Sequence, residues 1–326
     1  MKKILSLALI LAMVLAFAGI ASAEETLKLA VVVSGSTGDN GFYDSAVSGL
    51  NNLVANGYVT GNTIECKNDA SMFTTNIISA AEDYDIVVAV GWEFWDVLCE
   101  VVPEFTDTKF IFIDNGLDGI GDNLMSITYA QNEGSFLVGY IAGKLSETGK
   151  IGAIGGEDSE TINDFIVGYE AGAKLANPEA EVQVKYSNSY DDPAIGKEIA
   201  LAMYDNGCDI IFQVADKCGI GAFEAAAERN LFAIGVDTDQ KYMDPDHIIC
   251  SMKKEVGLSI EHAVCQLLDD EWLGGQIWVA GLSSGMVDVG YGDETMPQQV
   301  SDELKAEVEA VREQILAGEI EVPTAF

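Results

Sequence analysis

Short apolar runs alternate with longer helix-length stretches along almost the whole chain. The apolar runs, rich in Val, Ile, Leu, Phe and Ala, lie at 29–33, 86–90, 110–113, 151–154, 210–214 and 232–236. Runs of this kind are typical of strands buried on both faces of a parallel sheet. The helix-length stretches between them lie at 44–55, 136–145, 165–176, 194–204, 222–229 and 256–268. The alternation predicts an α/β fold of doubly wound, mainly parallel sheets flanked by helices.

Two segments of the chain, 85–114 and 209–237, share one plan. Each begins with Asp and a hydrophobic strand, continues through a polar or Gly-containing loop and a helix, and closes with a second strand that ends in Asp. The repetition predicts two lobes of similar fold, and a mature length of about 300 residues is natural for two domains. Ligands of such sheets bind beyond the carboxyl ends of the strands. We therefore expect Asp114 and Asp237 to face one cleft between the lobes.

The first 23 residues have the pattern of a secretory signal peptide. Lys2 and Lys3 precede an uncharged apolar run at 4–20, and Ala21-Ser22-Ala23 is a small-residue cleavage motif. We expect cleavage after Ala23 and export to a periplasm or to the cell exterior. A membrane anchor is the alternative interpretation, although the run is short and no basic flank follows it. The first cysteine is Cys66, so no lipid-accepting Cys is expected at the cleavage site.

Charge and composition argue against several classes of function. The formal charge of −36 becomes −38 when the two lysines of the signal peptide are lost, and such a surface repels nucleic acid and anionic lipid. The two histidines, His247 and His262, leave little material for zinc binding or histidine-based catalysis, and no cofactor is expected. Exported proteins can form disulfides, but buried free thiols are expected for Cys99, Cys250 and Cys265 because these lie in apolar segments.

Six segments of the chain occur in the order expected of one known family. They include GDNGFYDSAVSGL (38–50) and AFEAAAERNLFAIGVDTDQ (222–240), with the others at 132–146, 164–178, 189–212 and 249–256. On these segments the mature chain resembles the basic membrane protein family of solute-binding proteins. The resemblance implies a two-lobed periplasmic-binding-protein fold of type I, a purine nucleoside as ligand, the permease of an ABC importer as partner, and no enzymatic activity. We expect a monomer.

The chain departs from common patterns of this family at several places. Many relatives are lipoproteins, whereas this chain lacks the lipid-accepting Cys. Tyr43 stands where many relatives have Asn, Ser34 stands where Asp is common, and the loop 215–219 replaces a Gly-Gly-Thr-Gly-like loop. These changes lie at the rim of the expected site, so they concern the identity of the ligand rather than the fold.

The implied lobes are discontinuous in sequence. Lobe 1 is expected to comprise 24–128 plus 254–282, and lobe 2 to comprise 129–253 plus 283–326. The chain is expected to cross between them near 125–130, 252–256 and 281–286. These three crossings would form a hinge, and binding of a ligand would close the two lobes about it.

The flat base of a nucleoside favours an aromatic side chain against its face. The resemblance directs this role to Phe42, after the turn at 38–41, and to Phe165, at the start of a helix, with Trp92 and Tyr190 in reserve. The alternative interpretation of Phe42 is a core residue at a helix start. For Phe165 it is packing against the nearby Tyr169.

The vicinal hydroxyls of ribose need carboxylate acceptors and a cationic donor. Asp237 is the expected clamp for these hydroxyls, and Asp114 is its counterpart in the other lobe. The alternative for both is an Asp that forms a turn. Lys253 is the expected cation, bound to a hydroxyl, to a base oxygen or to Asp237. Its neighbour Lys254 is expected to be a solvated residue at a helix start.

Three further polar residues are candidates for contact with the ligand. Asp39 could accept from a base nitrogen, or it could cap the helix that starts near Phe42. Asp216, like Asp39, could contact the ligand or have only a structural role. Ser34 ends the first strand at the rim of the site. Residues expected to order the structure instead are Asp239 and Gln240, in the loop after Asp237, and Glu133, in the connection between the lobes.

Two other functions remain open. The acid-rich segment 237–246 resembles the Asp-Thr-Asp cluster of calcium-dependent nucleoside hydrolases, although those enzymes carry their acids on the first strand. An EF-hand is excluded because Lys241 and Tyr242 occupy ligand and glycine positions. The stronger alternative is the same binding fold with a different ligand, such as a sugar, a nucleobase or a signalling molecule.

Overall fold

The computed structural model describes residues 26–326, so the predicted signal peptide and the predicted N-terminus at Glu24 lie outside the described residues. The first half of this region contains β1 (Lys28–Val33), α2 (Phe42–Ala55), β2 (Thr60–Glu65), α3 (Ala70–Asp83), β3 (Ile86–Val90), α4 (Trp95–Val101), β4 (Lys109–Ile113), β5 (Leu124–Tyr129), α5 (Gln131–Leu145), β6 (Lys150–Gly155) and α6 (Glu160–Ala176). The second half contains β7 (Glu181–Tyr186), α7 (Pro193–Asp205), β8 (Ile210–Val214), α8 (Asp216–Arg229), β9 (Phe232–Asp237), β10 (Ile248–Lys254), α9 (Val256–Leu268), β11 (Ile277–Ala280), β12 (Val287–Gly290) and α10 (Asp302–Leu316).

The strands form two six-stranded sheets, one in each lobe. Their orders are β11-β5-β4-β3-β1-β2 and β12-β10-β9-β8-β6-β7, and the pairing is parallel except between β10 and β12. The repeated segments 85–114 and 209–237 become β3-α4-β4 and β8-α8-β9, which occupy corresponding places in the two sheets. The predicted doubly wound architecture is confirmed.

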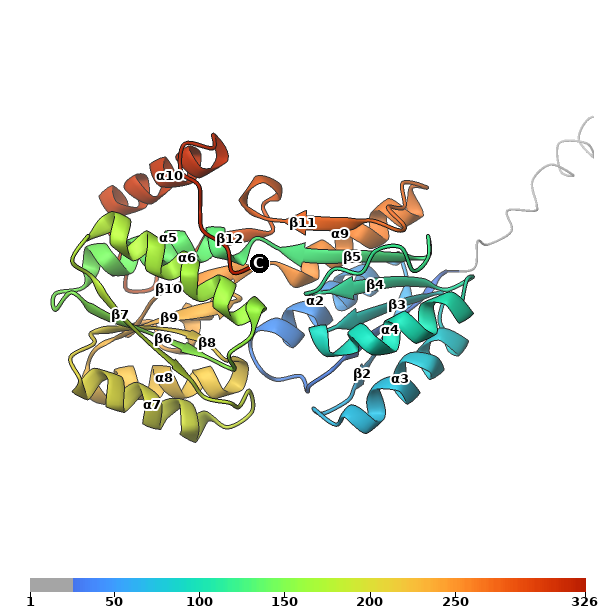
Figure 1. The fold of residues 1–326 in the computed structure, drawn as a ribbon, viewed down its shortest axis with the longest axis horizontal. Helices are drawn as coiled ribbons and strands as arrows, with labels where there is room; N and C mark the ends of the chain where they lie inside the picture. Colours follow the sequence, from blue (N-terminus) through green and yellow to red (C-terminus); the bar gives the residue numbers. More distant parts are fainter. Residues whose placement is uncertain (1–25) are drawn as a thin grey trace, which may run out of the picture.

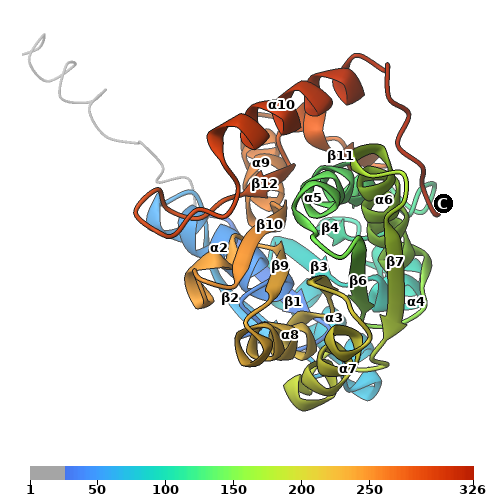
Figure 2. The ribbon, with the colours of Figure 1, turned by 90° about the vertical axis from the view of Figure 1, so that its left-hand side faces the viewer.

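Helices cover both faces of each sheet. In the second lobe α5 and α6 lie on one face and α7 and α8 on the other, and in the first lobe α2 and α9 lie opposite α3 and α4 (Figure 1, and Figure 2 from the side). The pair α5 and α6 approaches to backbone contact, because any side chain at Gly172 would collide with the carbonyl oxygen of Phe136. This close packing holds α5 and α6 together on one face of the second sheet.

The chain passes between the lobes at three short connections. Ala130 joins β5 of the first sheet to α5 of the second lobe, Glu255 joins β10 to α9, and residues 281–286 join β11 to β12. Glu133 accepts a hydrogen bond from the backbone N–H of Leu282 at 2.8 Å, so it ties two of the connections together. This confirms its expected role as an anchor.

The predicted elements agree best with the structure where they are buried. All six predicted strands are present, and the predicted helix at 256–268 matches α9. The strands β2 and β7 were not predicted because they are partly exposed edge strands with polar sequences, TGNTIE and EVQVKY.

Between residues 26 and 326 the structure contains no helix with the length and apolar character needed to cross a bilayer. All six cysteines are free, and Cys66, Cys208, Cys218 and Cys250 are buried. The expectation of a buried free thiol is therefore confirmed for Cys250. Cys99 and Cys265 are only partly buried.

Candidate functional site

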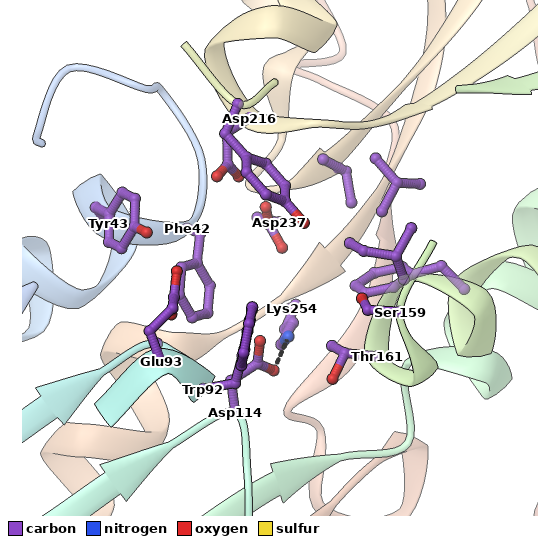
Figure 3. A pocket seen from close by; sticks show the side chains of 16 residues that line it. Phe42, Tyr43, Trp92, Glu93, Asp114, Ser159, Thr161, Asp216, Asp237 and Lys254 are labelled. Atoms are coloured by element: carbon purple, nitrogen blue, oxygen red, sulfur yellow. Dashed lines mark hydrogen bonds and ion pairs between the residues drawn. The ribbon is translucent and has the colours of Figure 1, made fainter. Parts of the chain in front are cut away.

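A cavity lies between the two lobes, at the carboxyl ends of the parallel strands (Figure 3). Its lining of aromatic side chains with a few convergent polar groups is typical of small-molecule sites. The first lobe contributes α2 and the loops after β3 and β4, and the second contributes the starts of α6 and α8 and the ends of β8, β9 and β10. The lining residues are Phe42, Tyr43, Gly91, Trp92, Glu93, Asp114, Ser159, Thr161, Ile162, Phe165, Tyr190, Val214, Asp216, Val236, Asp237 and Lys254.

Three aspartates at this cavity have left-handed backbone conformations. Asp114 follows β4 with φ 80°, Asp216 begins α8 with φ 46°, and Asp237 ends β9 with φ 64°. Asp tolerates this region better than most residues, but at some cost in free energy, and such strain often marks a functional site. As predicted from the repeated segments, Asp114 and Asp237 face one cleft.

The cation of the cavity is Lys254, which forms an ion pair with Asp114. Its side chain is 2% exposed, so the prediction of a solvated Lys254 is wrong. Successive residues of a strand point to opposite faces, and Lys254 rather than Lys253 lies on the face of β10 that meets the cleft. Lys253 is outside the cavity lining, and its ammonium pairs with Glu255.

Aromatic rings surround the Lys254 ammonium. Its nitrogen lies 5.1 Å from the ring centroid of Phe42, 5.3 Å from that of Phe165 and 4.8 Å from that of Tyr129, which is within the range of cation–π attraction. Phe42 belongs to the first lobe and Phe165 to the second, and both line the cavity. The two predicted aromatic candidates are thus brought to one site, with Trp92, 40% exposed, at its rim.

Burial dominates the electrostatics of the cavity. It raises the pKa of Asp237 to about 7, with Lys254 opposing the rise and Asp39 and Asp114 adding to it. Burial also raises the pKa of Asp216 well above its usual value and raises that of Glu93. A ligand that donates hydrogen bonds here would remove part of the cost of these buried carboxylates.

Two other predicted site residues lie outside the cavity lining. Asp39 caps the start of α2, accepting hydrogen bonds from the backbone N–H groups of Gly41, Tyr43 and Asp44 at 3.3, 2.8 and 3.0 Å. Ser34 is fully buried, and its hydroxyl lies 3.0 Å from the hydroxyl of Tyr43. Of the two roles considered for Asp39, the structure displays capping.

The residues after Asp237 organise their loop as predicted. Gln240 accepts a hydrogen bond from the backbone N–H of Val236 at 2.9 Å. Asp239 accepts from the N–H groups of Lys241 and Gly292 at 3.3 and 2.7 Å. These contacts leave Asp237 as the residue of the acidic loop whose side chain enters the cavity.

Besides Lys254, the polar lining residues that were not predicted from the sequence are Tyr43, Glu93, Ser159 and Thr161, and Tyr190 was held only in reserve. Glu93 follows Gly91, whose φ of +123° and contact with Ser34 leave no room for a side chain. Gly91, directly after a buried strand, was the feature of the sequence that could have indicated that Glu93 reaches the cavity. Ser159 and Thr161 were missed because α6 begins at Glu160, about one turn before the predicted start at 165.

The lobes are closed on each other, and hydrogen bonds cross the mouth of the cleft. Asn40 of the first lobe accepts at its backbone carbonyl from Thr238 at 2.7 Å and from Gln240 at 3.1 Å. Lys217 donates to the carbonyl of Thr37 at 2.9 Å, and Asn68 donates to Asp191 at 2.6 Å. These bonds stabilise the closed arrangement, and the residues that make them do not line the cavity.

Replacing Lys217 with Met should therefore weaken ligand binding although Lys217 does not line the cavity. Loss of this partly exposed hydrogen bond costs the closed state about 0.5–1.5 kcal/mol, which corresponds to about 2- to 10-fold in affinity if binding requires closure. Calorimetry of the variant measures the effect. Lys197→Met, which removes ion pairs within the second lobe, is the matched control. An unchanged affinity for Lys217→Met would rule out this contribution to closure.

Comparisons with known proteins agree with this architecture. A family model described as ABC transporter substrate-binding protein PnrA-like matches residues 26–325. Basic membrane protein A of Borreliella burgdorferi is 34% identical over 92% of this chain and 89% of its own length. A Lactococcus lactis protein named ABC transporter nucleoside-binding protein BmpA is 33% identical over 91% of this chain and 89% of its own.

Solved structures give the same result. An ABC transporter solute-binding protein from Aeropyrum pernix superposes with a TM-score of 0.82 at 25% identity, covering 91% of this chain and 94% of that one. The family consists of substrate-binding proteins of ABC transporters rather than enzymes, and it is extracytoplasmic. By the family model and by its relatives over most of its length, the chain belongs to the PnrA-like, basic membrane protein family of ABC transporter substrate-binding proteins.

Proposed function

We propose that the protein captures a nucleoside, most specifically a purine nucleoside, in the cavity between its lobes and delivers it to the permease of an ABC importer. The observation that carries this proposal is Asp237. Its buried carboxylate lines the same cavity as the Lys254 ammonium and the phenylalanines of the two lobes, and it interacts electrostatically with Lys254. One acceptor, one cation and two aromatic rings match the two halves of a nucleoside.

Each group has a distinct role in this proposal. Asp237 accepts hydrogen bonds from the vicinal ribose hydroxyls, and Lys254, held by Asp114, donates to a ribose or base oxygen. Phe42 and Phe165 contact the two faces of the base, each stack contributing about 1–3 kcal/mol. Ribose alone would lack the stacking, and a free base would lack the contacts with Asp237.

The proposed cycle requires motion of the lobes. We propose units of 24–128 plus 254–282 and 129–253 plus 283–326, which rotate about the three connections and close on the ligand. The cross-cleft bonds of Asn40 and Lys217 support this proposal, because they stabilise a closed arrangement. The relative named as nucleoside-binding supports the choice of ligand.

Calorimetry with a panel of ligands tests the proposal. Inosine, guanosine and adenosine should bind more tightly than ribose, glucose or the free bases, because only the nucleosides use both halves of the cavity. Tighter binding of a hexose or of a free base than of any nucleoside would favour the corresponding alternative. Product assays on the same samples, with added calcium, would reveal any hydrolase activity, which the family does not predict.

Binding of a nucleoside should release protons near pH 6.5. Because Asp237 accepts from both ribose hydroxyls with its two oxygens only when ionised, the ligand favours the deprotonated form of a group whose pKa is about 7. Affinity should therefore fall as the pH drops below about 7, by up to tenfold per pH unit for one proton. Titrations in two buffers of different ionisation enthalpy measure the release. Asp237→Asn should reduce it, and proton uptake in the wild type would contradict the assignment.

A further inference from the structure

The cavity contains more carboxylates than its single cation can neutralise. Glu93, Asp114, Asp216 and Asp237 line it, and Lys254 is the one cationic side chain among the lining residues of the described chain. Lys254 is already paired with Asp114, and Asp237 is assigned to the ribose by the proposed function. Glu93 and Asp216 are therefore left for another part of the ligand.

These two carboxylates lie on a common side of the cavity, although they come from different lobes. Glu93 follows β3 of the first lobe and Asp216 begins α8 of the second. The burial of Tyr43 is the largest cause that raises its pKa, and the negative charges of Glu93 and Asp216 are the next largest. Figure 3 shows both acids on the side that carries Tyr43 and Phe42, with Ser159 and Thr161 on the opposite side. We call Glu93 and Asp216 the acidic wall.

The acidic wall offers acceptors in a site that excludes much of the water. The carboxylate of Asp216 receives no hydrogen bond from the described residues, and the opposing charge that lowers its pKa is that of Lys254. An amino group on the ligand would donate to these oxygens. An ionised acidic wall presents only lone pairs to a carbonyl oxygen in the same place, so that oxygen would gain a partner only if Glu93 or Asp216 took up a proton.

The opposite side has complementary chemistry. Ser159 and Thr161 carry hydroxyl groups at the start of α6, and the Ser159 oxygen has no hydrogen-bond partner in the described structure. Hydroxyl groups can donate to ring nitrogens or to carbonyl oxygens. A base with donors on one edge and acceptors on another would match both sides.

We propose that Glu93 and Asp216 select a purine nucleoside whose base carries an exocyclic amino group over nucleosides with hydrogen or oxygen at that position. The selection rests on the proposed function, since it presumes that a nucleoside enters this cavity. The amino group donates to the acidic wall, while the base stays between Phe42 and Phe165. Glu93 and Asp216 are thus specificity determinants rather than general contributors to affinity.

Matched ligands test the selection by calorimetry at pH 7.5. Guanosine, inosine and xanthosine carry an amino group, hydrogen and oxygen at one carbon, and adenosine carries an amino group where inosine has oxygen. In the wild type the tighter of guanosine and adenosine should bind about 10- to 100-fold more tightly than inosine and xanthosine, as expected for one or two satisfied buried acceptors.

The affinity of the tighter amino nucleoside divided by that of inosine should fall at least threefold in Asp216→Asn and in Glu93→Gln, because an amide also donates to oxygen. It should stay unchanged in Glu100→Gln, which removes an exposed charge of α4. A fall in only one of the two cavity variants supports the selection and assigns it to that residue.

Two results would overturn the proposal. The selection is refuted, with nucleoside binding left intact, if inosine binds the wild type as tightly as guanosine and adenosine do. It is refuted in the same way if the preference for the amino nucleoside over inosine persists in both cavity variants. Failure of every nucleoside to bind the folded wild type, judged by its thermal melt, would refute the proposed function and the selection together.

Discussion

Asp237→Ala should weaken nucleoside binding by about 2–5 kcal/mol. If the carboxylate accepts from both vicinal hydroxyls, its removal leaves two donors without partners in a buried site, at about 1–3 kcal/mol each. This corresponds to about 30-fold to several thousand-fold in affinity. The fold should survive, because the side chain ends a strand and lies in a cavity rather than in the apolar core. Calorimetry with the preferred nucleoside measures the loss.

Deoxynucleosides provide the control for this variant. The 2′-deoxy and 3′-deoxy forms should bind the wild type poorly, but should lose little further affinity in Asp237→Ala, because the interaction is already missing. If the variant binds ribonucleosides as tightly as the wild type does, Asp237 only forms the turn after β9. The assignment of Asp237 as the acceptor of the ribose hydroxyls would then be wrong.

Lys254→Met should reduce the free energy of unfolding by about 3–5 kcal/mol. The Lys254 side chain is 2% exposed and that of its partner Asp114 is 11% exposed, and removing one member of a buried pair leaves the other charge uncompensated. Chemical denaturation without ligand measures the change. The double variant with Asp114→Asn should recover part of it.

The adjacent lysine is a matched control for this prediction. Lys253 and its partner Glu255 are each 27% exposed, and partly exposed ion pairs contribute about 0–1 kcal/mol. Lys253→Met should therefore change the stability by no more than about 1 kcal/mol. Equal effects of Lys253→Met and Lys254→Met would show that the buried pair with Asp114 does not have the importance that its burial suggests.

The positions of the strand ends could be predicted from the sequence, and with them much of the site. Asp114 and Asp237 directly follow apolar runs at corresponding places of the two repeated segments, so two lobes that face each other bring both acids to one cleft. The choice between Lys253 and Lys254 could not be made in this way. It depends on which face of β10 meets the cleft, and strand alternation alone does not define that face.

Other differences come from local and tertiary contacts that compete for the same side chain. Asp39 is adjacent to the site in sequence, but the free N–H groups of α2 bind its carboxylate first. Glu93 reaches the cavity because a glycine with positive φ turns the chain after β3, and no periodic pattern reports such a turn. The Asp216 position depends on where α8 begins, six residues before the predicted start at 222.

Native mass spectrometry of the purified protein, before and after an equimolar mixture of nucleosides, ribose and free bases is added, tests the central claim most directly. We predict one bound molecule with the mass of a nucleoside, present from the host cell or acquired from the mixture. A protein that stays unliganded in the mixture, or that retains a sugar or a free base in preference to every nucleoside, would contradict it.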